Sequence, residues 1–158
     1  PEAVCLVPEN RNEITTEGGL NVASQVESIK ATTEKLGQVG IEVSLFIDPD
    51  PKQIEATAQT GSPVIELHTG PFADSYAHES KRSIEIERLI KAAEHAKGLG
   101  LIVNAGHGIN YENVQGLFSV PHLKELNIGH SIISRAITVG LSQATSEMLT
   151  KMAGYDIE

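Results

Sequence analysis

The feature that most constrains the fold of this 158-residue chain is a regular alternation of short apolar runs with helix-length segments. Between most of the runs, apolar residues recur at helical spacing, as at Val22, Val26, Ile29 and Leu36. Strands that alternate with helices form βα units and a parallel sheet, which is either open and doubly wound or closed into a barrel. The five predicted strands, rich in β-branched and aliphatic residues, cover 4–9, 43–48, 64–69, 101–106 and 125–130.

Local signals predict where several helices begin and end. Asp50 followed by Pro51 is typical of an N-cap and a first helical position, and Gly61 ends that short helix. Asn110 predicts a cap for the segment after it, and the long segment 78–98 ends in a glycine-rich stretch. A last helix is predicted from helically spaced apolar residues: Ile132, Ile133, Ala136, Val139 and Leu141.

The alternation of side chains within the strands favours the barrel. In 64–69, Glu66 and His68 share one face while Ile65 and Leu67 share the other. A parallel strand covered by helices on both faces is apolar throughout, whereas a barrel strand has one face towards an interior that carries the active site at its carboxyl end. Polar residues gather at the strand ends: Glu9, Asp48, Glu66, His68, Asn104, His107, Asn127 and His130.

Composition excludes several classes of protein. A formal net charge of −9 argues against binding to nucleic acid or to an anionic membrane. No apolar stretch approaches the roughly 20 residues of a membrane helix, and the first residues do not resemble a signal peptide, so a soluble cytoplasmic protein is expected. The single cysteine, Cys5, forms no internal disulfide, which favours a reducing compartment, and its apolar surroundings predict a core position.

Three of the six histidines, His68, His107 and His130, lie at predicted strand ends and are candidate acid/base groups. Glu66 would be a carboxylate inside the barrel and needs a partner or a raised pKa. An ion pair with a neighbouring strand is the structural alternative for Glu66.

Two turns carry the signature of a phosphate site. In NAGHG (104–108), glycines flank His107, which permits a sharp turn and close approach of a ligand to the main chain. NIGHS (127–131) is a strand end followed at once by a helix. Barrels often bind phosphate at the turns after their last two strands. The loop 14–22, with threonines and glycines before a helix, is a weaker anion-binding candidate.

The lysines, histidines and carboxylates of the chain bear on three other chemistries. A Schiff-base aldolase needs an inward-pointing strand lysine, and all lysines lie in predicted helices or loops. A metal site could use Glu66, His68, His107 and His130, but no compact ligand spacing supports it. A phosphosugar isomerase or epimerase, in which Glu66 or His68 moves protons beside a carbonyl, stays open.

Five strings, CLVPENRNEITTEGGLNV, VSLFID, IELHTGPFAD, VNAGHGINYENV and ELNIGHSIISRA, occur in this order. Together they resemble the pyridoxine 5′-phosphate synthase family over essentially the whole chain. The resemblance implies a (β/α)₈ TIM barrel of the α/β class, of which the five C-terminal βα units are present, so that residues 1–158 form the C-terminal portion of one barrel domain.

The resemblance also implies an activity and its residues. The family condenses 3-amino-2-oxopropyl phosphate with 1-deoxy-D-xylulose 5-phosphate to give pyridoxine 5′-phosphate, phosphate and water, with no metal or organic cofactor. It implies a transferase-type enzyme that assembles as a homo-oligomer, an octamer in the family. By motif, His107 corresponds to the proton donor and Glu66 to the residue that stabilises the transition state, while the expected phosphate contacts are Thr15, Gly108, Gly129 and His130.

One departure from the family pattern is large. The first three strands, with a further catalytic histidine and glutamate and an arginine contact, have no counterpart in this sequence. A noncatalytic ligand-binding or assembly piece is therefore the alternative from a different class of function.

Overall fold

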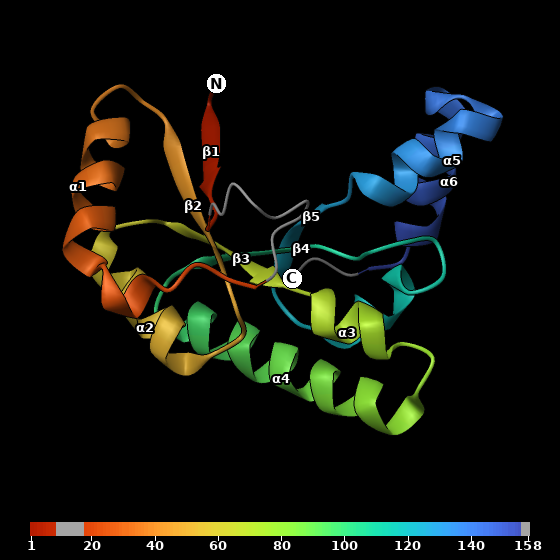
Figure 1. Ribbon diagram of the computed structural model, residues 1–158, viewed down its shortest axis with the longest axis horizontal. Helices are drawn as coiled ribbons and strands as arrows, with labels where there is room; N and C mark the ends of the chain where they lie inside the picture. Colours follow the sequence, from red (N-terminus) through yellow and green to blue (C-terminus); the bar gives the residue numbers. More distant parts are fainter. Residues whose placement is uncertain (9–17, 156–158) are drawn as a thin grey trace.

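The fold is built on one sheet of five parallel strands, seen in a computed structural model that describes residues 1–8 and 18–155 (Figure 1). Glu9 and Thr15 lie outside these described residues. The strands are β1 (Ala3–Leu6), β2 (Glu42–Ile47), β3 (Val64–His68), β4 (Ile102–Gly106) and β5 (Leu123–Asn127).

The order of the strands in space repeats their order in the sequence, and every neighbouring pair is parallel. An open doubly wound sheet reverses its order at a switch point, whereas a barrel adds each new strand beside the previous one. The sheet is therefore an arc of five βα units of a (β/α) barrel. Among the described residues, β1 and β5 each pair with one strand only and form the two open edges.

Helices cover the outer face of the arc. They are the 3₁₀ turn η1 (Val22–Ser24), α1 (Val26–Gly37), α2 (Pro51–Thr60), the short α3 (Gly70–Ser75) and the long α4 (Glu79–Gly98). Figure 1 shows α1, α2 and α4 along one side of the sheet. Full burial of a side chain of Leu or Ile size contributes about 1.5–3 kcal/mol, so this layer supplies much of the stability. The outward strand residues beneath it are all fully buried: Val43, Leu45, Ile47, Ile65 and Leu67.

The predicted helix ends of the first half are confirmed. The Asp50 carboxylate accepts a hydrogen bond from the backbone N–H of Lys52 and caps α2, which begins at Pro51. Gly61 ends the same helix in a left-handed conformation with φ 76°. Helix α4 ends at Gly98 as predicted.

The C-terminal segment differs from the single helix that its apolar spacing predicts. After the 3₁₀ helix η2 (Val114–Ser119), the chain forms α5 (His130–Val139) and α6 (Leu141–Met152). Gly140, with φ 84° and ψ 153°, separates the two helices, because this backbone conformation cannot continue a helix. The apolar residues counted as one helix therefore belong to two, which pack against each other beyond β5 (Figure 1).

Two further expectations are wrong. Cys5 is exposed, because it lies on an edge strand with its thiol towards the open inner face of the sheet. The predicted strand 125–130 begins and ends earlier, at 123–127, so Lys124 is a strand residue. Side chains alternate along a strand, so Lys124 points away from the face occupied by its neighbour Glu125.

None of the helices within 1–8 and 18–155 combines the length and the apolar character needed to cross a bilayer.

Candidate functional site

The candidate site lies at the carboxyl edge of the sheet, where the parallel strands end side by side. Asp48 follows β2, His68 ends β3, Gly106 ends β4 and Asn127 ends β5. The registers of β3 with β4 and of β4 with β5 pair His68 with Gly106 and Gly106 with Asn127. Asp48 and Asn127, which are 79 positions apart in the sequence, thus share one edge.

Glu66 occupies the inner face of β3 and is 8% exposed. Its Oε2 accepts hydrogen bonds from Asn127 Nδ2 at 2.6 Å and from the Cys5 thiol at 3.4 Å. Gly106 lies so close that a Cβ atom there would overlap Oε1 of Glu66, which explains the first glycine of the 104–108 turn. The partners of Glu66 are neutral donors, so the structural alternative, an ion pair with a neighbouring strand, is not formed among the described residues.

The surroundings of Glu66 favour its protonated form. Burial raises the pKa of the Glu66 carboxyl, and this effect exceeds the opposing hydrogen bonds from Cys5 and Asn127 and the charge of His68. Although Cys5 is exposed as a residue, partial shielding of its thiol from water, followed by the nearby Glu66, raises the pKa of the thiol to about 12, so Cys5 acts here as a hydrogen-bond donor.

We expect Glu66→Gln to stabilise the fold in a pH-dependent way. A carboxyl with a raised pKa binds its proton more tightly in the folded chain, so its contribution to stability is complete below its ordinary pKa and is lost as the pH rises through the raised value. In a full-length family protein that contains these residues, the variant should therefore have a larger free energy of unfolding than the wild type at about pH 7–8, and the gap should shrink towards about pH 4. Urea denaturation at both pH values measures it. A gap that stays constant or widens at low pH would contradict the assignment.

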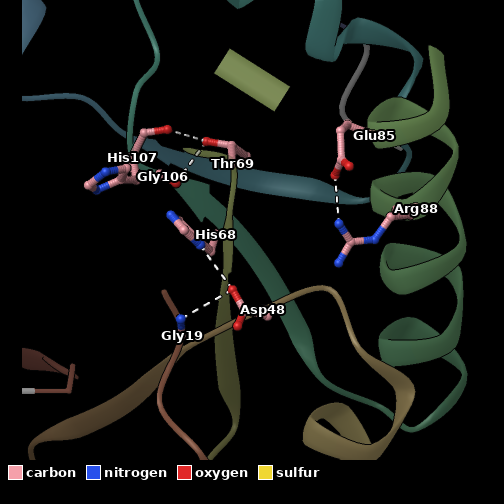
Figure 2. A network of polar contacts seen from close by, with 8 residues as sticks. All are labelled: Gly19, Asp48, His68, Thr69, Glu85, Arg88, Gly106 and His107. Atoms are coloured by element: carbon pink, nitrogen blue, oxygen red, sulfur yellow. Dashed lines mark hydrogen bonds and ion pairs between the residues drawn. The ribbon is translucent and has the colours of Figure 1, made fainter. Parts of the chain in front are cut away.

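His107 adopts an uncommon backbone conformation, with φ 82°. The hydroxyl of the fully buried Thr69 donates to the carbonyl oxygens of Gly106 and His107, at 2.7 and 2.6 Å, and the Thr69 N–H also binds the Gly106 carbonyl. Figure 2 shows these bonds joining the ends of β3 and β4. Thr69 therefore holds the histidine in place, although its sequence position gave no sign of this role.

The turn continues through residues that are held by side chains from the following elements. Asn113 Nδ2 donates to the carbonyl oxygen of Gly108, which has φ 76°, and the Ser131 hydroxyl donates to the carbonyl oxygen of Ile109. The Asn110 side chain accepts from the backbone N–H groups of residues 112 and 113 in the turn before η2, whose N-cap is Asn113 rather than the predicted Asn110. The turn is thus fixed from both sides.

The environment of His107 favours the neutral imidazole. Partial burial of the ring, followed by the positive charges of His68 and His130, lowers the pKa of His107, while Asp74 acts in the opposite direction. An imidazole of this kind is a stronger acid once protonated, which suits proton transfer.

The two turns singled out from the sequence form one cavity of about 320 Å³. Its walls include His107, Gly108, Asn127, Gly129 and His130. Gly129 is the N-cap of α5, so the free N–H groups at the start of this helix face the same region. A larger hollow of about 620 Å³, between α1 and α2 at the opposite ends of the strands, contains none of the candidate residues.

The structure brings most of the predicted site residues together. His107, Gly108, Gly129 and His130 share the cavity, and Glu66 is joined to its wall through Asn127. Within the part of the chain that the structure describes, no group of three or more metal-ligating side chains is placed to share an ion, so the alternative metal set is not assembled.

Sequence reasoning missed one further polar contact of the inner face. Asn104 Nδ2 donates to Glu125 Oε2 at 3.3 Å, between β4 and β5. The alternation that places Asn127 inwards also places Glu125 inwards, two residues earlier, and could have identified it.

Residues 1–154 match the family described as pyridoxal phosphate biosynthesis protein PdxJ. The chain belongs to this family. Curated family relatives are named pyridoxine 5′-phosphate synthase, and those from Opitutus terrae and Photobacterium profundum are each 56% identical over 152 residues. The relative from Aliivibrio fischeri is 52% identical over 154 residues.

The chain is shorter than these members of the family. The matches cover 96% to 98% of the chain but only 61% to 63% of the relatives. A solved structure, the xylose isomerase domain protein from Planctomyces limnophilus, aligns with a TM-score of 0.57 at 14% identity, over 95% of this chain and 61% of that one. At this identity the likeness concerns the fold alone. It agrees with the predicted class, a TIM barrel of which five βα units are present.

Proposed function

We propose that the protein containing this chain closes the pyridoxine ring by condensing 3-amino-2-oxopropyl phosphate with 1-deoxy-D-xylulose 5-phosphate. The observation that carries the proposal is the convergence of His107, Glu66 and the two glycine turns at the carboxyl edge of the barrel strands. Relatives named pyridoxine 5′-phosphate synthase support the same reaction. The products would be pyridoxine 5′-phosphate, phosphate and water.

In this proposal His107 donates a proton to the condensing substrates. Its position beside the cavity and the hold of Thr69 on its backbone support the role. A positioned proton donor typically contributes about 10²- to 10⁴-fold to the rate. The lowered pKa of His107 makes its protonated form the better acid.

Glu66 would stabilise the charge that develops during condensation. A carboxyl on a poorly solvated inner face interacts more strongly with a reacting centre than one in water. Asn127 fixes Oε2 of Glu66 and also lines the cavity, so it connects the carboxyl to the space where the substrate would lie.

The phosphate groups would bind at the turns. Gly108, Gly129 and His130 line the cavity at the start of α5, where unpaired backbone N–H groups and the helix dipole favour an anion. Thr15 would add a contact from the loop outside the described residues.

The remaining features of the proposal follow the family resemblance. Residues 1–158 would be the C-terminal portion of a single barrel domain in a cytoplasmic transferase that uses no metal or organic cofactor. The enzyme would form a homo-oligomer, an octamer as in the family, and would bind neither nucleic acid nor membranes; the formal charge of −9 supports the last point.

An assay of a full-length family protein that contains these residues tests the function. With both phosphorylated substrates and an excess of chelator, we expect pyridoxine 5′-phosphate to form, and only when the amine is supplied. Isomerisation of the sugar phosphate without the amine would instead support an isomerase. Binding of pyridoxine 5′-phosphate with no turnover would support a noncatalytic role, and either result would overturn the proposal.

A further inference from the structure

His68 lies between an acidic residue and the candidate proton donor. Its Nδ1 is 2.9 Å from Oδ1 of Asp48, and its ring meets that of His107 edge to face, with 5.0 Å between the ring centroids. Figure 2 shows Asp48 and His107 on opposite sides of His68. Neither Asp48 nor His68 has a role in the function proposed above.

The contact with Asp48 defines how the hydrogen is placed on His68. An ionised carboxylate can only accept hydrogen bonds, so Nδ1 of His68 carries the hydrogen. In the neutral ring, Nε2 then carries the lone pair. Nε2 lies on the side of Gly70 and His107, since a Cβ at Gly70 would overlap Nε2 of His68 and approach Cδ2 of His107 to 3.1 Å.

The surroundings confine the ring of His68, whereas His107 is exposed at the edge of the sheet. The His68 side chain is 9% exposed. Phe46 packs against both imidazole rings, with centroid distances of 5.1 Å to His68 and 6.3 Å to His107. Asp48 is itself fixed, because the same Oδ1 accepts the N–H of Gly19 at 3.1 Å. A continuous set of contacts therefore runs from the loop before α1, through β2 and β3, to the turn after β4.

We propose that Asp48 and His68 form a positioning pair that orients the ring of His107 and controls its charge. The proposal rests on the proposed function only in assigning proton donation to His107. A proton on His68, held by Asp48, repels a second proton on His107 across a ring-to-ring contact of 5.0 Å. The two imidazoles therefore hold one proton more readily than two. His107 then gives up its proton readily when His68 is protonated.

The charged groups around the pair are consistent with this coupling. His107 faces His68 from β3, Asp74 from α3 and His130 from α5, and the two histidines contribute to its lowered pKa. His68 in turn faces Asp48, Glu66 and His107. Among the charges around His107, that of His68 has the largest effect on its pKa.

The test is a titration of the His107 ring by NMR in a full-length family protein that contains these residues, with ¹⁵N-labelled histidine. In His68→Gln, the amide can still donate to Asp48 but cannot carry a charge, so the His107 midpoint should move to higher pH. In Asp48→Asn, the ring nitrogens of His68 should no longer report a single hydrogen on Nδ1. His95→Gln is the matched control, since His95 lies 3.3 Å from a carboxylate oxygen of Glu55 on the outer helices, and it should leave His107 unchanged.

Turnover gives a second readout. In His68→Gln, kcat should fall by about 10- to 100-fold with little change in KM, as is usual when a residue that orients a functional group is lost. The alkaline limb of the kcat profile should move to higher pH together with the His107 midpoint. An unmoved midpoint in His68→Gln, or an unchanged His68 spectrum in Asp48→Asn, would overturn the proposal. The titration needs no activity, so a wild-type protein without turnover would overturn only the proposed function.

Discussion

Replacing His107 with asparagine in a full-length family protein that contains these residues is expected to lower kcat by roughly 10²- to 10⁴-fold, with substrate affinity largely retained. Asparagine is chosen because it tolerates a positive φ better than other non-glycine residues, and His107 has φ 82°. The bonds from Thr69 reach backbone oxygens and can persist in the variant. The loss should therefore reflect the missing proton rather than a rearranged turn. Steady-state kinetics with both substrates measures it.

His122→Asn provides the control for this experiment. His122 is the other non-glycine residue with a positive φ among the described residues, at 64°, and it precedes β5 at the opposite end of the strands. The same substitution in a similar backbone conformation should leave kcat within about twofold of the wild type, as for most surface changes. If kcat of His107→Asn falls tenfold or less, His107 is a binding residue and not the proton donor.

The 158-residue chain by itself is expected to show no ring closure. Barrel closure ties the number, tilt and stagger of the strands together, and five strands do not satisfy it. The edge strands β1 and β5 each have one partner among the described residues, which leaves their outer backbone groups unpaired. The inner face that carries Glu66 is correspondingly incomplete.

Exposed apolar side chains on α5 and along β5 also indicate that further elements must cover this part of the chain. Helix α5 has no buried residue, and Ile133 and Ile137 are 58% and 83% exposed. A hollow of about 390 Å³ runs along β5, with apolar walls that include Phe118, Leu126 and Tyr155. Apolar surface of this kind is normally covered, and when exposed it favours aggregation.

Complementation with the remaining strands tests directly whether the isolated chain lacks ring closure for this reason. The chain is assayed with both phosphorylated substrates, alone and after refolding with a separate polypeptide that supplies the remainder of a relative's length. We expect product only in the mixture, because the added strands would pair with both edges and bring the missing acid/base groups, each worth about 10²-fold or more. A parallel mixture with an unrelated barrel fragment controls for nonspecific rescue. Turnover by the isolated chain near the rate of a full-length relative would contradict the prediction.

The sequence by itself determined the features that depend on neighbouring residues. The period of apolar residues distinguishes strand from helix, and capping chemistry identified Asp50 as the N-cap of α2 and Gly61 as the residue that ends it. Alternation along 64–69 identified Glu66 as an inward carboxyl, and the position of NAGHG after a strand placed His107 at the edge of the sheet. These properties require only the local geometry of one strand or one helix.

Only the tertiary structure decided the contacts between distant segments. The Asp48–His68 pair, the hold of Thr69 on the His107 turn and the bond from Cys5 to Glu66 join residues 20 to 61 positions apart. They depend on the register of neighbouring parallel strands and on side-chain rotamers, neither of which is encoded in local periodicity. The exposure of Cys5 has the same origin: an apolar run predicts a strand, but whether its faces are covered depends on which elements pack against it.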